Sequence, residues 1–200
     1  TAVATVSGTT ITIVGAGTST ITASQANTAN YGSGTITTPL TVNKATPTIT
    51  NFSEITKTFG NVDFSLVAPT TNSDGSFTYT SSNTAVATIA GSTVTIVGSG
   101  TATITASQAT TTNYLAGTTT ATMTVSKATP MITMFDVPAK AIGTAPFSLV
   151  APTSNSSGAF TYTSSNTSVA TIDGSMVTIV GLGNTTITAV QASTTNHLSG

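Results

Sequence analysis

Apolar and polar residues alternate with a period of two along most of this chain. Residues 101–106 read Thr-Ala-Thr-Ile-Thr-Ala, and residues 120–125 read Thr-Ala-Thr-Met-Thr-Val. Shorter alternating stretches lie at residues 64–68, 77–80 and 93–96. This period places successive side chains on opposite faces of a strand, and Thr suits the exposed face because it is β-branched and polar. No window shows a sustained period of 3.6 residues, so the pattern predicts an all-β fold.

The same phrases also return over a longer distance. "TAVAT" at Thr1 returns at Thr84 and, as "TSVAT", at Thr167, so that successive copies start 83 residues apart. "FSLVAPT" at Phe64 returns at Phe147 with the same spacing. A unit of this length exceeds the roughly 20–50 residues of solenoid and propeller repeats and is long enough to be a small domain. We therefore expect small domains in tandem, like beads on a string.

Turn signals divide each unit into short strands. Ser7-Gly8, Ala90-Gly91 and Asp173-Gly174 lie where a two-residue hairpin turn fits. Residues 72–75 and 155–158 carry a second set of loop signals, rich in Asn, Ser and Gly. About seven short strands with regular turns in one unit predict a small β-sandwich.

The phrase Lys-Ala-Thr-Pro follows the apparent last strand of a unit, so we place domain boundaries at Lys44 and Lys127. Pro47 suits the first residue of an edge strand. The junction between domains is short and contains a proline, which predicts limited hinge freedom. The boundaries predict the C-terminal part of one domain at residues 1–43, a complete domain at residues 44–126, and a domain that lacks its last strand at residues 127–200.

A glycine pair at Gly15-Ala16-Gly17 resembles the start of a phosphate-binding loop. A third glycine would be needed at the position of Thr20, a helix should follow, and the first acidic residue in the chain is as distant as Glu54. The pair also returns at residues 98–100 and 181–183. We therefore interpret it as a hairpin bend between two strands and predict no nucleotide cofactor.

The composition narrows the range of partners. The chain has 4 Lys and Arg against 5 Asp and Glu, a net charge of −1 and no Cys. With this net charge the chain has no basic surface that would bind nucleic acid or an anionic membrane. No apolar run is long enough to cross a membrane. The 38% of hydrophobic residues nevertheless predicts a buried core rather than disorder.

Three phrases identify a family resemblance. "KATPTIT" at Lys44, "FTYTSSNTAVATIAGSTVTIVGSGTATITASQA" at Phe77 and "TATMTVSKA" at Thr120 resemble bacterial Ig-like repeat domains, which occur in tandem in very large bacterial surface proteins. The resemblance implies an Ig-like sandwich, an extracellular or cell-surface location, and no catalysis. It also implies a role in adhesion, in spacing a terminal binding domain, or in building a fibre. The chain departs from ordinary members in its near absence of charge.

No candidate chemical site recurs in all copies. His197 stands where the other copies have Tyr31 and Tyr114, which predicts an exchange of one ring for another rather than a metal ligand. Calcium would need several carboxylates, and none of the acids recurs: Glu54, Asp63, Asp74, Asp136 and Asp173. An internal Lys–Asn isopeptide bond would need a buried carboxyl group as well as its recurring partners: Lys44, Lys57, Lys127, Lys140, Asn72, Asn83, Asn155 and Asn166. We therefore predict no catalytic, cofactor-binding or metal-binding residue.

These observations predict a structural protein rather than an enzyme. The leading hypothesis is an extracellular bacterial stalk, fibre, filament or sheath, built by tandem and lateral packing of domains that associate with identical chains. Sheet edges without charged residues do little to prevent such association. The alternative is a spacer that presents a terminal adhesive domain, with a glycan or host-surface ligand elsewhere in the protein. A carbohydrate-binding module, using Tyr31 and Tyr114, or an ice-binding module, using the Thr rows, is a third class.

Overall fold

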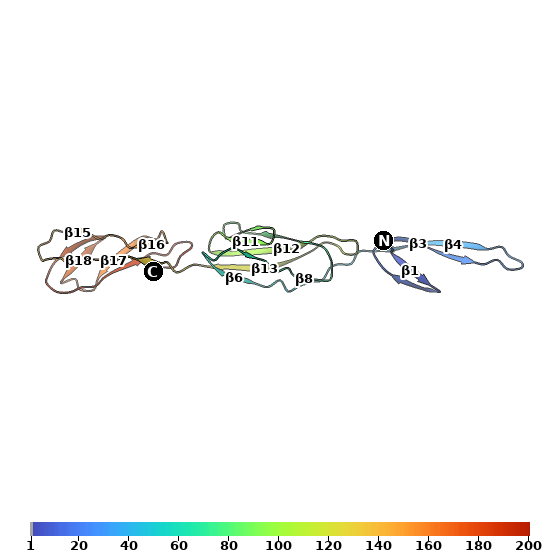
Figure 1. Ribbon diagram of the computed structural model, residues 1–200, viewed down its shortest axis with the longest axis horizontal. Helices are drawn as coiled ribbons and strands as arrows, with labels where there is room; N and C mark the ends of the chain where they lie inside the picture. Colours follow the sequence, from blue (N-terminus) through green and yellow to red (C-terminus); the bar gives the residue numbers. More distant parts are fainter. Residues whose placement is uncertain (1) are drawn as a thin grey trace.

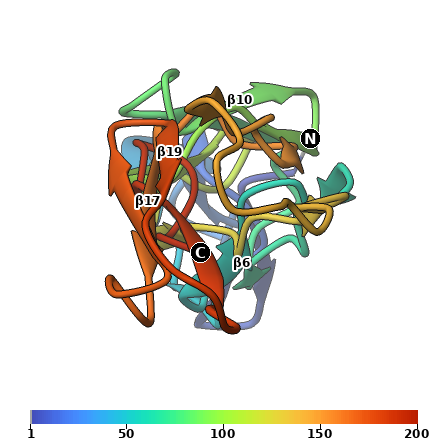
Figure 2. The same cartoon turned by 90° about the vertical axis from the view of Figure 1, so that its left-hand side faces the viewer.

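The computed structural model describes residues 2–200, which form twenty β-strands and no helix. Thr1, with which the first predicted domain segment begins, lies outside the described residues. Three groups of strands follow one another along the long axis of the molecule (Figure 1) and lie behind one another when viewed from its end (Figure 2). We call β1–β4 the first group, β5–β13 the middle group and β14–β20 the last group. The prediction of a tandem all-β fold is confirmed.

The middle group is a sandwich of two main sheets. One sheet has the strand order β6-β13-β12-β9, the other has the order β10-β11-β7, and β5 pairs with β8 beside them. The strands are β5 (Ile49–Thr50), β6 (Ile55–Thr58), β7 (Phe64–Ser65), β8 (Thr70–Thr71), β9 (Phe77–Ser81), β10 (Ala87–Ala90), β11 (Thr93–Ile96), β12 (Gly100–Gln108) and β13 (Gly117–Ser126).

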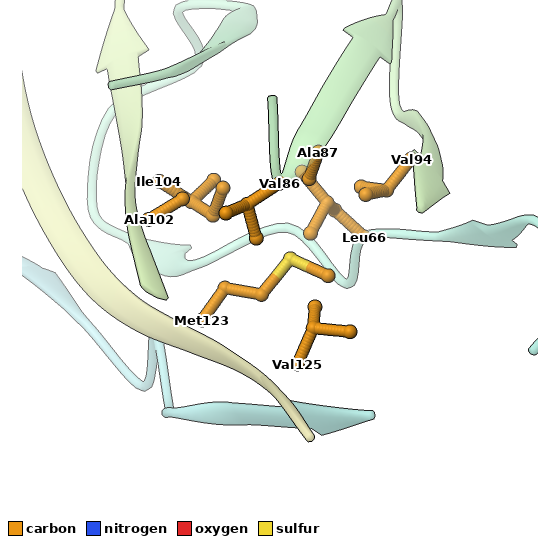
Figure 3. Packing of buried hydrophobic residues seen from close by; sticks show 8 residues of the cluster. All are labelled: Leu66, Val86, Ala87, Val94, Ala102, Ile104, Met123 and Val125. Atoms are coloured by element: carbon orange, nitrogen blue, oxygen red, sulfur yellow. The ribbon is translucent and has the colours of Figure 1, made fainter. Parts of the chain in front are cut away.

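The alternating pattern explains why the two main sheets face each other. In the pairing of β12 with β13, Ala102 lies opposite Met123 on the inner face, whereas Thr101 lies opposite Thr124 on the outer face. Both sheets contribute to one hydrophobic core, and burial in this core raises the pKa of Tyr79. The core shown in Figure 3 consists of Leu66, Val86, Ala87, Val94, Ala102, Ile104, Met123 and Val125.

One pairing in the middle group is parallel. β13 follows β12 as an antiparallel neighbour and is flanked on its other side by β6, in a register that sets Met123 opposite Ile55 and Val125 opposite Lys57. β13 therefore lies between β6 and β12, which are far apart in the sequence. Its side chains Met123 and Val125 belong to the hydrophobic core.

The first group contains only two hairpins. β1 pairs with β2, and β3 pairs with β4. Side chains whose repeat positions face the core in the middle group are more exposed here: Ile11 is 45% exposed, whereas Val94 at the same repeat position is 0% exposed. The strands are β1 (Ala4–Ser7), β2 (Thr10–Ile13), β3 (Gly17–Gln25) and β4 (Gly34–Val42).

The last group resembles the middle group without its last strand. Within residues 2–200, β20 pairs only with β17, and residues 138–141, which are equivalent to β6, form no strand. In the middle group β6 and β12 both pair with β13, and β6 reads Ile-Thr-Lys-Thr where residues 138–141 read Pro-Ala-Lys-Ala. The strands are β14 (Ile132–Thr133), β15 (Phe147–Ser148), β16 (Thr153–Ser154), β17 (Phe160–Ser164), β18 (Ala170–Asp173), β19 (Met176–Ile179) and β20 (Ile187–Gln191).

The predicted hairpin turns exist, but each lies one residue later than predicted. β1 ends at Ser7 and β2 begins at Thr10, so that Gly8 and Thr9 form the turn. Gly8, Gly91 and Gly174 have φ angles of 60°, 61° and 58°, which glycine adopts without a steric penalty. Gly at the first turn position, rather than at the second, therefore defines these hairpins.

The interpretation of Gly15-Ala16-Gly17 as a hairpin bend is wrong. The strands on either side, β2 and β3, lie in different sheets, as do β11 and β12 around Gly98-Ser99-Gly100. The glycine turn therefore carries the chain from one layer of the sandwich to the other. Sequence alternation identifies two strands, but it cannot say whether consecutive strands pair.

Candidate functional site

The glycine turn has a tight geometry that needs both of its glycines. Val97 and Gly98 donate backbone hydrogen bonds to the carbonyl oxygen of Val86, at 2.9 and 3.2 Å. A Cβ atom on Gly98 would lie 2.7 Å from the carbonyl oxygen of Ala85, and Gly100 has a φ angle of 141°. A side chain at either position would clash or strain the backbone. The turn leaves the central amide, that of Ser99, directed outward at the end of the sandwich.

A loop of the middle group reaches the equivalent turn of the first group, Gly15-Ala16-Gly17. The loop between β12 and β13 is closed by hydrogen bonds from the Thr111 amide and the Thr110 hydroxyl to the carbonyl oxygen of Tyr114, at 3.0 and 2.9 Å. The segment that joins the first and middle groups is bound to the same loop. Ala45 donates to the carbonyl oxygen of Asn113 at 2.9 Å, and Lys44 Nζ lies 2.5 Å from the carbonyl oxygen of Thr111. The linker and the loop therefore form one unit.

Asn113 at the tip of this loop makes the contact between groups. Its Oδ1 atom accepts a hydrogen bond of 2.8 Å from the amide of Ala16, in the glycine turn of the first group. The same contact recurs in the second junction, where Oδ1 of Asn196 accepts a hydrogen bond of 2.9 Å from the amide of Ser99. The two residues of each pair are 97 positions apart in the sequence. The glycine turn is thus a socket for an asparagine of the following group.

The second junction contains two further contacts. The Ser99 hydroxyl donates to the carbonyl oxygen of Thr195 at 2.5 Å. The ring of His197 meets that of Phe59 edge to face, with 5.4 Å between the ring centroids. His197 is therefore a buried contact of the junction, at the place that the sequence predicted for a ring. Residues 2–200 contain no group of His, Cys, Asp or Glu side chains that could hold a metal ion.

The lysines that were considered for an isopeptide bond contact rings and carbonyl groups. Lys57 Nζ lies 4.4 Å from the ring centroid of Phe64, and Lys140 Nζ lies 5.0 Å from that of Phe147. Lys127 Nζ lies 2.6 Å from the carbonyl oxygen of Thr194, which repeats the contact of Lys44 in the linker. These contacts are those of cations that hold loops in place.

Two tyrosines of the predicted sugar-binding alternative lie in different surroundings. Tyr31 is 78% exposed, in the loop between β3 and β4. Tyr114, at the same repeat position, is half-buried and pairs through its backbone with Ala45 of the linker. The two rings therefore do not form an exposed platform that is repeated along the chain.

A buried glutamine was missed by the sequence analysis. Gln108 is 2% exposed, and its Nε2 atom donates to the carbonyl oxygens of Ser73 and Gly75, at 3.1 and 2.9 Å. Its Oε1 atom accepts a hydrogen bond of 3.0 Å from the Thr71 hydroxyl, and Gln191 repeats the arrangement in the last group. The signal was present, because "SQA" and "VQA" retain Gln at this position among Thr, Ser and Ala.

Comparison with known proteins gives a match to two copies of the repeat. A family model described as "Intimin, immunoglobulin-like domain" matches residues 70–110 and 152–193. The domains of this family are non-catalytic, and no enzymatic family matches the chain. A search of curated proteins gives no match. Residues 2–200 include no helix of the length and apolarity that a membrane span needs.

Solved structures of several multidomain proteins are similar to the chain. A protocadherin gammaB7 fragment is 13% identical with a TM-score of 0.35, and the alignment covers 98% of this chain and 63% of that one. Human protocadherin-24 is 17% identical with a TM-score of 0.34, over 74% of this chain and 87% of that one. A SusE-like surface-located polysaccharide-binding protein of Bacteroides thetaiotaomicron is 14% identical with a TM-score of 0.30, over 90% and 36%. The chain thus spans less than two thirds of the gammaB7 fragment.

Proposed function

We propose that this chain, which carries two bacterial immunoglobulin-like domains of the intimin type, is a non-catalytic stalk segment of a bacterial cell-surface protein. Its domains are coupled end to end by the asparagine–glycine-turn junction. In this proposal the domains extend over residues 44–126 and 127–200, and residues 1–43 end the preceding one.

The observation that carries the proposal is the repetition of one junction. Asn113 and Asn196 accept hydrogen bonds from the central amides of two successive glycine turns, at 2.8 and 2.9 Å. A flexible linker would leave neighbouring domains free to adopt different relative orientations. Two junctions with the same donor and the same acceptor instead favour a fixed step from one domain to the next. Repetition of a fixed step extends a chain, which is what a stalk requires.

Small-angle scattering of the chain in solution tests this proposal. The wild type should have the distance distribution of one extended particle. The double variant Asn113→Ala, Asn196→Ala should show a shorter mean maximum dimension, because each junction loses its hydrogen-bond acceptor.

Asn30→Ala is the matched control, because Asn30 has the same repeat position in a group that follows no glycine turn in this chain. This variant should scatter like the wild type. A wild type that is already compact and variable in shape would contradict the proposal.

We propose in addition that stalks pack side by side through the threonine face of the sheet β6-β13-β12-β9. Thr105 lies between Thr80 of β9 and Thr120 of β13, and Ser107 lies between Thr78 and Thr118. These rows are uncharged, so neighbouring chains meet no electrostatic repulsion there. Electron microscopy of the native material tests this packing. We expect ordered filaments or sheaths, whereas isolated flexible strings would contradict lateral packing and favour a spacer that presents a terminal adhesive domain.

A further inference from the structure

The sandwich of the middle group is open along one side. β6 and β7 are the end strands of its two main sheets, whereas β9 and β10, at the other ends of the same sheets, contact each other. A groove of about 460 Å³ lies beside β6 and β7. The apolar side chains that line it include Phe52, Ile55, Phe64 and Leu66. The open side therefore exposes an apolar surface between the two sheets.

Both end strands also have a backbone edge without a strand partner. Within the described residues β6 pairs only with β13, and β7 pairs only with β11. Such edges are templates for a strand from another chain. Val62 and Val67, on either side of β7, are 85% and 82% exposed. The open side thus has the features of a surface at which a second copy of the chain would add a strand, because burial of these apolar side chains would stabilise the contact.

A charged side chain lies in this groove. Lys57 is half-buried between the exposed residues Thr56 and Thr58 of β6, so it occupies an inward position of the strand. In the pairing of β6 with β13 it lies opposite Val125, a core residue. Its Nζ atom is 4.4 Å from the ring centroid of Phe64 on β7, so the side chain reaches from one sheet to the other. Lysine suits this place because its alkyl stem covers apolar surface while its ammonium group stays hydrated.

The same contact recurs in the last group. Lys140 Nζ lies 5.0 Å from the ring centroid of Phe147, and the two residues have the repeat positions of Lys57 and Phe64. The residues around Lys140 form no strand, so the contact does not depend on the pairing of β6. Glu54 also lines the groove of the middle group, but its repeat position carries Val137 in the last group. Of the 4 Lys and Arg in the whole chain, two are thus placed over the same ring of successive groups.

We propose that Lys57 and Lys140 prevent copies of this chain from associating through the open sides of their sandwiches. A strand of a second copy that paired with β6 or β7 would cover the groove and take the ammonium group of Lys57 out of water. Burial of a cation without a carboxylate partner is costly. An inward-pointing charge on an edge strand therefore blocks edge pairing, and it does so without a change in the outward face of the sheet.

The two lysines would then determine which surface is left for lateral packing. The outward strand positions of the sheet β6-β13-β12-β9 carry only Thr and Ser, so no charge opposes association there. Blocked open sides and unblocked threonine faces together would direct neighbouring chains to one mode of contact. This step rests on the proposed lateral packing, whereas the block itself is a property of the open side and can be tested alone.

Removal of both charges in the full chain tests the block. The variant Lys57→Met, Lys140→Met keeps an unbranched side chain in each place and makes it apolar. In sedimentation velocity it should associate at a concentration at least about tenfold lower than the wild type, because no cation has to be buried. Hydrogen exchange of the β6 and β7 amides should slow with rising concentration in this variant alone, since their edges become paired. The variant Lys57→Arg, Lys140→Arg keeps the charge and the ring contact and should behave like the wild type.

The matched control is Lys44→Met, Lys127→Met, which removes the same charge from the linkers and leaves both rings covered. Circular dichroism checks that each variant is folded, and Lys57→Gln, Lys140→Gln, uncharged but polar, takes the place of the methionine variant if that one does not fold. A methionine variant that associates no more than the wild type overturns the proposal. Equal association of the control overturns it as well, because net charge rather than position would then decide. Isolated strings in electron micrographs of the native material would contradict lateral packing whatever these variants do, so the two proposals can fail independently.

Discussion

The buried glutamines, Gln108 and Gln191, are polar side chains that need several hydrogen-bond partners inside the fold. Gln108 ties β8 and the loop between β8 and β9 to the end of β12 through three hydrogen bonds, and no buried side-chain N or O atom of the described residues is left without a partner. A buried polar group of this kind stabilises the fold only when all its hydrogen bonds are made. We therefore regard this position as the main polar determinant of the core.

Gln108→Leu should lower the free energy of unfolding by about 1–3 kcal/mol, because the carbonyl oxygens of Ser73 and Gly75 would lose their donor in a buried loop. Urea denaturation measures the change. Gln25→Leu is the matched control, since Gln25 has the same repeat position but is exposed in the first group. Equal effects of the two substitutions would show that the hydrogen bonds of Gln108 contribute nothing specific.

A second residue-scale feature is a left-handed backbone position that recurs without glycine. Asn51 and Met134 have φ angles of 59° and 60° and occupy the same repeat position. Asn tolerates this conformation, whereas an unbranched apolar residue is strained in it. The side chain of Met134 is 84% exposed, so it gains little from packing in return.

Met134→Asn should accordingly raise the free energy of unfolding of the last group by about 0.5–1 kcal/mol, as backbone strain is relieved. Thermal denaturation followed by circular dichroism measures the shift. Met131→Asn serves as the control, because Met131 is also exposed but is not among the residues with a positive φ angle. A loss of stability in Met134→Asn would show that this methionine makes a contact that its exposure hides.

At the scale of elements, β13 is the strand that pairs with both β6 and β12. β6 pairs with it in parallel, and β12 pairs with it along its whole length. In the last group, which lacks this strand, β20 covers Ile187–Gln191 whereas β12 covers Gly100–Gln108, and residues 138–141 are not a strand. Residues 138–141 read Pro-Ala-Lys-Ala where β6 reads Ile-Thr-Lys-Thr, so they have a weaker strand sequence as well as no strand partner.

Extension of the chain after Gly200 by the residues of 118–126 should convert residues 139–141 into a strand. The added residues supply the parallel partner that β6 has in the middle group. Hydrogen exchange of these amides should slow. An extension with Asp in place of Met123 and Val125 is the control, because carboxylates cannot enter the hydrophobic core of the last group. Unchanged exchange rates in the first extension would contradict this account of residues 138–141.

At the scale of the whole molecule, the chain is an extended row of groups with very little charge (Figure 1). Charged residues make up 4% of the sequence, and the junctions consist of hydrogen bonds and one ring contact. The relative placement of the groups therefore owes little to Coulomb interactions, unlike that of domains coupled by ion pairs or bound cations.

The shape of the chain should accordingly be insensitive to salt. We expect the radius of gyration of the chain to stay constant from about 0.01 M to about 1 M NaCl, over which the Debye length falls from roughly 30 Å to roughly 3 Å. Small-angle scattering measures it, and chelation of divalent cations should be equally without effect. A clear change with salt would show that the few charged side chains carry a coupling that the contacts do not reveal.

Sequence reasoning succeeded where the information is local. Alternation in residues 101–106 and 120–125 predicted β12 and β13, since a period of two places one set of side chains inside. It failed for Gly15-Ala16-Gly17, because two consecutive strands can pair or can lie in opposite layers with the same local pattern. It also missed Asn113, whose partner is 97 residues away and whose own neighbours are ordinary loop residues.

The amino-acid sequence by itself determined the all-β class, the tandem repeat and the inward and outward faces of each long strand. These properties follow from short periods and from the return of whole phrases. Only the tertiary structure decided that the glycine turn is a socket for an asparagine, that Gln108 is buried, and that residues 138–141 are left without a strand partner. Each of these depends on which distant segment lies alongside, and backbone hydrogen bonds and core contacts between distant segments are formed only in the folded chain.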